Sequence, residues 1–180
     1  MTKRKDIWIG LLLIVVVAAA GLVWLAPWQG DRAPDVRLQT LDGDRFSLGD
    51  LRGQPVIVAF WATSCPECVK EIPYFRALHD DFNDQGLEII AVAMEYDPES
   101  QVRAMADDRD MNYTVVLDRD GSIARAFGDI RLTPTTFLIG PDGEILHQRL
   151  GKVDMDRMRE RITGLLPGEQ FAGTGGNGQG

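Results

Sequence analysis

Cys65 and Cys68 are the only cysteines in the 180-residue sequence, and only Pro66 and Glu67 separate them. The apolar run before them, residues 55–62, has the length and β-branched content of a buried strand, and apolar residues at helical spacing follow them. We therefore expect the pair where a strand ends and a helix begins. There the free N–H groups of the first helical turn and the helix dipole stabilise a thiolate, which is the reactive form of cysteine.

The two cysteines are expected to do different chemistry. Cys65 occupies an N-cap position, where its sulfur can accept a hydrogen bond from the N–H of Glu67 or Cys68, and Pro66 suits the first helical position. Cys68 is expected to be more covered and to attack a mixed disulfide formed at Cys65, which releases the substrate. The pattern predicts a redox-active dithiol.

Two other uses of a C-x-x-C pair fit the sequence less well. A structural zinc site needs four ligands, but the chain has no further cysteine and its two histidines, His79 and His147, lie far apart. A purely structural disulfide would close too short a loop to stabilise the fold much. We expect neither a metal nor a cofactor.

An uncharged apolar stretch, residues 7–26, precedes the cysteines and would form a helix ~30 Å long, enough to cross a bilayer. Basic residues 3–5 come before it, so the positive-inside rule places the rest of the chain outside the cytoplasm. The alternative is a signal peptide cleaved near residues 18–21. An uncleaved anchor is favoured because cleavage there would leave an apolar start to the mature chain.

The predicted organisation is a cytoplasmic N-terminus (1–6), a transmembrane anchor (7–26), a linker (27–34), a folded domain (35–167) and a disordered glycine-rich tail (168–180). The first 30 residues hold three basic side chains and one acidic one, so the remainder of a chain with net charge −8 carries −10. This charge argues against nucleic acid as a partner.

Strand and helix patterns alternate along the folded part, which predicts an α/β sandwich with a mixed central sheet. Pro73 lies inside the helix that follows the cysteines, and Thr133-Pro134 precedes an apolar strand, where a cis peptide bond could turn the chain. The expected elements are a hairpin (36–40 and 45–48), strands at 55–62, 87–94, 113–117, 135–139 and 144–150, and helices ending near 85–86, at 99–109, around 123–127 and at 155–166.

Several of these features together resemble the thioredoxin fold: Phe-Trp-Ala at a strand end, C-x-x-C at a helix start, a proline five residues later, and Thr-Pro before the next-to-last strand. The longer pattern is similar to the membrane-anchored TlpA/ResA branch over residues 33–166. It comprises Ala33-Pro34-Asp35, Leu41-Asp42-Gly43, Leu51-Arg52-Gly53, Glu71-Ile72-Pro73 and residues 133–139.

The resemblance implies a thiol–disulfide oxidoreductase on the outer side of a bacterial inner membrane. It is expected to act as a reductase on cysteine-containing proteins, apocytochrome c among them, and to receive electrons from a DsbD/CcdA-type membrane protein. Cys65 then corresponds to the attacking thiol and Cys68 to the resolving thiol. Pro134 matches the cis-proline, and the backbone of Thr133 is expected to pair with an extended substrate near Trp61.

Glu71 matches the acidic residue that this branch carries after its cysteines, and its spacing places it one turn beyond Cys68 on the same helix face. If it is buried there, it can accept the proton of Cys68; the alternative is a solvated surface glutamate. Thioredoxin has a buried acid at the position of Ala59, which leaves Glu71, or else Glu95, for that role.

Two departures from the family pattern bear on the reduction potential. Ser64 replaces an aromatic residue before Cys65, and the carboxylate of Glu67 lies between the cysteines, where it opposes thiolate formation. A disulfide oxidant, or a non-catalytic tethered binding module, therefore remains as an alternative. A peroxiredoxin is not expected because Val58 and Ala62 stand where its proline and threonine belong, and the C-x-x-x-C of a copper chaperone is absent.

Overall fold

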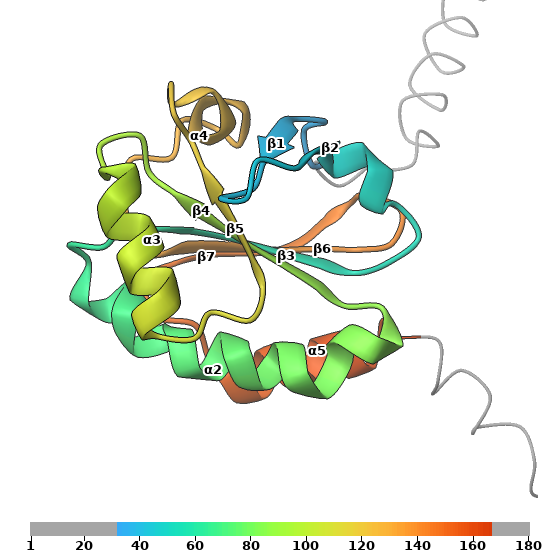
Figure 1. Ribbon diagram of the computed structural model, residues 1–180. Helices are drawn as coiled ribbons and strands as arrows, with labels where there is room; N and C mark the ends of the chain where they lie inside the picture. The colour runs from blue at the N-terminus through green and yellow to red at the C-terminus, as the bar shows by residue number, and fades with distance from the viewer. Residues whose placement is uncertain (1–31, 167–180) are drawn as a thin grey trace, which may run out of the picture. The chain divides into compact units, whose positions relative to one another are not determined.

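The computed structural model describes residues 32–166, and a five-stranded sheet forms their centre (Figure 1). The strand order is β5-β4-β3-β6-β7. β3 pairs in parallel with β4, and β4 with β5, whereas β6 and β7 run antiparallel to their neighbours, so the sheet is mixed as predicted. The strands are β3 (Val56–Trp61), β4 (Glu88–Ala93), β5 (Thr114–Leu117), β6 (Thr135–Ile139) and β7 (Ile145–Leu150).

Each face of the sheet packs against its own hydrophobic core, because alternate residues of a strand point to opposite faces. In Figure 1, α2 (Pro66–Phe82) and α5 (Met155–Thr163) lie beneath the sheet, and α4 (Ser122–Ala126) lies above it. The lower core contains Trp61, Cys68 and residues of α3 (Glu99–Asp108). Phe60, Phe127 and Phe137 form the centre of the upper core, with their rings in mutual contact.

The predicted N-terminal hairpin is present as β1 (Arg37–Gln39) and β2 (Arg45–Ser47). It lies at the β5 edge of the sheet, where Thr40 pairs with Val116. A short 3-10 helix, η1 (Leu48–Leu51), follows it, and its N-terminus is closed by a capping box formed by Ser47 and Asp50.

Two predicted helix ends were placed too late. α2 ends at Phe82 and continues as the 3-10 helix η2 (Asn83–Gln85), where left-handed Gly86 turns the chain. α5 ends at Thr163 instead of residue 166, although Leu166 still packs in the lower core. After α5, Leu165 and Leu166 continue the apolar spacing past the end of the helix, so the hydrophobic pattern extends beyond it. After α2, the polar residues of η2 continue the helical turn in 3-10 geometry, which places the α-helix end before the chain turns at Gly86.

The predicted N-terminus (1–6), anchor (7–26), tail (168–180) and most of the linker lie outside the described residues. Within residues 32–166, no helix combines the length and the apolar character needed to span a bilayer.

Candidate active site

The start of α2 places Cys65 at the end of the sheet. β3 ends at Trp61, the Cys65 N–H donates to the Ala62 carbonyl (3.0 Å), and Pro66 begins the helix. Cys65 is the N-cap residue, and its Sγ accepts the N–H of Cys68 at 3.2 Å. Of the two predicted donors, the structure therefore shows Cys68. The sulfur lies at the N-terminus of a 17-residue helix, in the positive field of the helix dipole.

The two cysteines form a disulfide and differ in exposure as predicted. Cys65 is half-buried, whereas Cys68 is only 4% exposed and belongs to the lower core. A disulfide partner approaching from solvent therefore meets Cys65 first. Cys68 lies behind it, positioned to attack a mixed disulfide at Cys65.

Glu67, between the cysteines, points into solvent and pairs with Lys70 at 2.6 Å. Lys70 lowers the pKa of Glu67 through this hydrogen bond and through its charge. The carboxylate is thus ionised at neutral pH, but an adjacent ammonium offsets its field. Its expected opposition to a Cys65 thiolate is weakened in consequence.

Glu71 is buried, which excludes the alternative of a solvated surface glutamate. Its side chain is 3% exposed, on the same buried face of α2 as Cys68. Burial raises the pKa of Glu71, and the negative charge of Glu67 adds to the rise. The N–H of Val153, which donates to Oε1 at 2.6 Å, and the charge of Lys152 partly offset it. A buried carboxylate of raised pKa is suited to accept a proton from a neighbouring thiol.

Glu95, the other candidate for the buried acid, is exposed at the end of β4 and does not fill that role. Ser64 is also exposed, so no side chain at this position covers the disulfide. The sequence pattern could not separate Glu71 from Glu95, because burial of Glu71 depends on the segment around Val153, which is 82 residues away.

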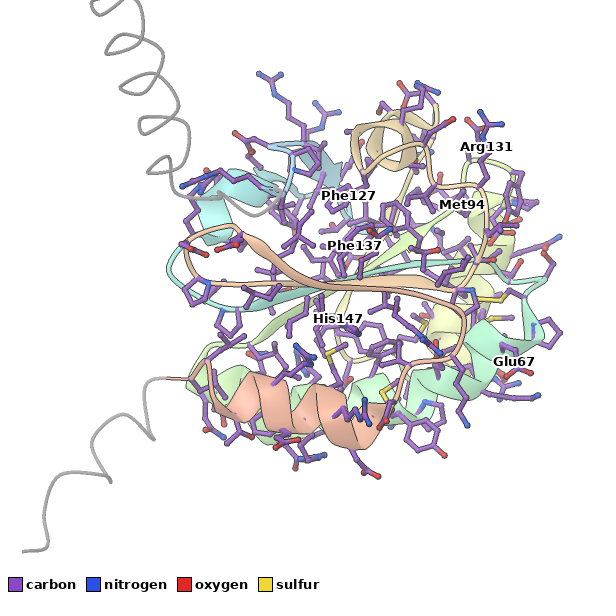
Figure 2. All side chains as sticks on the ribbon, turned by 180° about the vertical axis from the view of Figure 1, so that it is seen from behind. Glu67, Met94, Phe127, Arg131, Phe137 and His147 are labelled. Carbon is purple, nitrogen blue, oxygen red and sulfur yellow. A yellow bond between two sulfur atoms is a disulfide. The ribbon has the colours of Figure 1, made fainter. Side chains whose placement is uncertain are left out.

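The Thr133–Pro134 peptide bond is cis, at the start of β6. Pro134 is buried, and its carbonyl accepts the N–H of Gly151 at 2.8 Å. In Figure 2, Glu67 at the start of α2 and Arg131 of the preceding loop lie at the same end of the molecule. The structure thus brings the C-x-x-C pair and the cis-proline segment to one end of the sheet.

Thr133 is half-buried, and its backbone makes no hydrogen bond to another described residue. Trp61 is 4% exposed and belongs to the lower core with Cys68. It therefore lies under the site, and its indole N–H has no hydrogen-bond partner among residues 32–166. Within the same range, no cluster of three or more His, Cys, Asp or Glu side chains has the geometry to hold a metal ion.

Asp97 is a site residue that the sequence reading missed. Its carboxylate accepts two hydrogen bonds from Thr63, from the backbone N–H (2.6 Å) and from the hydroxyl (3.1 Å). It is held in turn by its own N–H, which donates to the Met94 carbonyl at 2.9 Å. Parallel strands β3 and β4 end at the same edge of the sheet, so an acidic residue shortly after β4 could have been predicted to contact the loop that follows β3. Asp97 fixes the loop that leads into Cys65.

We expect Asp97→Ala to lower the free energy of unfolding by about 1–2 kcal/mol, because two hydrogen bonds to a carboxylate are lost. Alkylation of Cys65 in the reduced protein should also become less uniform in rate, since its loop is no longer held. Urea unfolding and iodoacetamide kinetics measure the two effects. Glu95→Ala, which removes an exposed carboxylate two positions earlier, is the control; an equal loss in both variants would contradict the role of Asp97.

Comparison with known proteins gives a consistent family. Residues 29–148 match the family model described as AhpC/TSA family. The chain is 32% identical over 176 residues to "Thiol-disulfide oxidoreductase ResA" of Halalkalibacterium halodurans, covering 93% of this chain and 99% of that relative. The protein of the same name from Bacillus subtilis is 32% identical over 178 residues, covering 94% and 98%.

Solved structures agree with the sequence relatives. The thiol:disulfide interchange protein of the thioredoxin family from Chlorobium tepidum superposes with a TM-score of 0.70 at 26% identity, covering 78% of this chain and 99% of that one. StoA from Bacillus subtilis superposes with a TM-score of 0.62 at 25% identity, covering 71% and 96%. The thioredoxin-like fold expected from the motifs is thereby confirmed.

Proposed function

Because this chain belongs to the AhpC/TSA family and, within it, to the ResA-type thiol–disulfide oxidoreductases, we propose that it works as a reductase of protein disulfides outside the cytoplasm. The observation that carries the proposal is the layered arrangement at the start of α2. Half-buried Cys65 faces solvent, Cys68 lies beneath it, and buried Glu71 follows on the same helix face.

The proposed cycle begins with both cysteines reduced. The Cys65 thiolate attacks one sulfur of the substrate disulfide, which forms a mixed disulfide and releases one substrate thiolate. Glu71 takes the proton of Cys68, and the resulting thiolate attacks Sγ of Cys65. The Cys65–Cys68 disulfide forms, the second substrate thiolate leaves, and two electrons have passed to the substrate.

The charges around the pair favour the reducing direction. Formation of two thiols from the disulfide is most favourable when the thiolate is strongly stabilised, and a strongly stabilised thiolate makes an oxidant. Here Sγ of Cys65 accepts one backbone N–H, and the carboxylates of Glu67 and Glu71 lie on the same first turns of α2. Because Lys70 offsets the charge of Glu67, the buried carboxylate of Glu71 is the acid that chiefly limits thiolate stability and so lowers the potential.

The substrate is proposed to bind as an extended segment beside the cis-proline. The backbone of Thr133 is available there for pairing. Leu132, which precedes it, and Leu150, which lies opposite Thr135 on β7, expose 62% and 56% of their surface. Exposed apolar side chains next to free backbone groups suit a strand-like peptide. Pro134 orients this segment, and Trp61 supports it from below.

The partners follow from the predicted location. The apolar stretch of residues 7–26 is proposed to anchor the chain in the bacterial inner membrane with residues 32–166 on the outer side. Re-reduction of the disulfide there requires electrons from across the bilayer, for which a DsbD/CcdA-type membrane protein is the proposed donor. Apocytochrome c is the proposed substrate among cysteine-containing extracytoplasmic proteins.

The reduction potential tests the direction of electron flow. In a chain that starts at residue 31, Trp61 is the single tryptophan, and it lies in the core that contains Cys68, so its fluorescence should report the redox state of the pair. We expect a midpoint near −270 mV or below in a dithiothreitol buffer. A value near about −120 mV would make the protein an oxidant. A disulfide that never opens, with unchanged partner binding, would instead favour a non-catalytic module.

A further inference from the structure

Several basic side chains gather between the edge strand β7 and α5. A cavity of about 270 Å³ there is lined by three arginines and a histidine. We call it the basic groove; its charged and titratable lining consists of His147, Arg149, Asp154, Arg157 and Arg161. Figure 2 shows His147 below the sheet, between β7 and the helix that covers it.

The positive charge of the basic groove is only partly neutralised. Asp154 pairs with Arg157 at 3.3 Å, whereas Arg161 makes no ion pair with another residue in 32–166. Arg157 and Arg161 also stand four residues apart on α5, a spacing at which like charges repel. A chain of net charge −8 thus gathers unpaired positive charge at one place.

Arg159, on the same helix, makes both an ion pair and a contact with an aromatic ring. It pairs with Asp81 at 2.6 Å, and its guanidinium lies 5.1 Å from the centre of the Phe82 ring. Arg161 has neither kind of contact within the described part of the chain. The difference separates an arginine that stabilises the fold from one that is available to a ligand.

The pKa of His147 responds to the positive electrostatic potential inside the basic groove. Burial lowers the pKa of His147, and the positive charges of Arg161 and Arg149 lower it further. The two guanidinium groups therefore act on the same small volume. An anion placed there would be attracted by both and would reverse their effect on His147.

The basic groove continues toward the disulfide end of the molecule. Arg149, Val153 and Asp154 also line a second hollow, which contains Glu71 and Lys152. In the sheet, His147 lies opposite Leu138, four residues beyond Pro134, which is ~13 Å along a strand. An extended peptide spans this distance in about four residues.

We propose that the basic groove binds an acidic segment of the protein substrate, about four residues away from the cysteine that Cys65 attacks. This inference rests on the proposed exchange reaction and adds a selection rule to it. Substrates with Asp or Glu at that spacing are captured by Arg149 and Arg161, while the rest of the acidic surface repels acidic chains that approach elsewhere. The groove thereby sets both the choice and the orientation of the substrate.

Matched peptides test the rule on the reduced full-length chain. Each peptide carries one cysteine as a mixed disulfide with a chromogenic aryl thiol. The residues at the fourth and fifth positions, either before this cysteine or after it, are both Glu in one peptide and both Gln in its counterpart. Attack by Cys65 releases the aryl thiol, and Cys68 then releases the peptide thiol. At low salt, the Glu peptide whose acidic residues lie on the side that reaches the basic groove should react about threefold to tenfold faster than its Gln counterpart. A salt concentration of about 0.5 M should remove the difference.

The preference should disappear in Arg161→Gln and persist in Arg159→Gln, which removes the same charge from a neighbouring position of α5. The Gln peptides should react equally with all three proteins. Equal rates for Glu and Gln peptides with the unaltered chain would overturn the inference and leave the exchange reaction standing. Failure of every peptide to react would instead count against the exchange reaction.

Binding can be read separately from turnover in the disulfide form. The chain has only two histidines, so the ring signals of His79 and His147 are readily distinguished by NMR. The Glu peptide should raise the pKa of His147, whereas the Gln peptide should not, and the ring signals of His79, on α2, should not move with either peptide. An unchanged His147 with both peptides would overturn the proposed site even if the reaction rates differ.

Discussion

Cys65→Ser is expected to abolish disulfide exchange, whereas Cys68→Ser is expected to retain the first chemical step and stop at a mixed disulfide. The reason is the difference in position. Cys65 is the half-buried N-cap residue that substrate can reach, and Cys68 lies 4% exposed behind it. Without Cys68 the mixed disulfide has no internal thiolate to resolve it. The Cys68→Ser protein should therefore accumulate adducts with its substrates.

To measure these adducts, thiol–disulfide exchange in cells is quenched with acid and free thiols are alkylated. Non-reducing gels and mass spectrometry then detect the mixed disulfides. The wild-type protein and Cys65→Ser should show few of them, and the double variant none. Both single variants lack the disulfide, so their fold is compared with that of the reduced wild-type protein by circular dichroism. Full turnover in either single variant would contradict a two-cysteine mechanism.

The local parts of the site could be predicted from sequence because short-range rules decide them. A buried strand followed by C-x-x-C with proline at the first helical position places Cys65 at a helix start, and the structure confirms this. The hairpin at residues 37–47 and the cis bond before Pro134 follow in the same way from turn and X-Pro chemistry.

Contacts between distant segments could not be predicted, because no local pattern records which loops meet. The Val153 N–H that Glu71 accepts is 82 residues away, and Asp97 holds Thr63 across 34 residues. The same holds for the basic groove, where arginines of β7 and α5 converge only after the sheet edge and the last helix have packed. The charge pattern of α5 taken alone predicts only a helix with an ordinary solvated face.

Glu71→Gln is expected to slow resolution of the mixed disulfide by about two orders of magnitude at neutral pH, the size typical of a lost general base. Glutamine keeps the shape and can still accept the N–H of Val153, which reaches Oε1 of Glu71 at 2.6 Å, but it cannot take a proton from Cys68. Stopped-flow Trp61 fluorescence follows the step. Glu67→Gln, which removes an exposed carboxylate four residues earlier, serves as the control and should change the rate far less.

The same substitution should make the disulfide form more stable at neutral pH. Burial raises the pKa of Glu71 above the value of 4.5 expected in the unfolded chain, so the folded protein binds this proton more tightly. The stability that it contributes is fully present below pH 4.5 and is lost as the pH rises through the folded-state pKa. Urea unfolding between about pH 4 and pH 8 should show this loss in the wild-type protein and a flatter profile in Glu71→Gln.

A slower enzyme that is also more stable would distinguish a catalytic carboxylate from a structural one. If Glu71 served only as an acceptor for the N–H of Val153, the glutamine variant would keep its rate of resolution, although the gain in stability from removing a buried ionisable group would remain. A carboxylate kept ionisable in the core for proton transfer destabilises the fold at the pH where it works. Loss of rate together with gain of stability is therefore the expected pair of results, and a gain of stability with an unchanged rate contradicts the assignment of Glu71 as the base for Cys68.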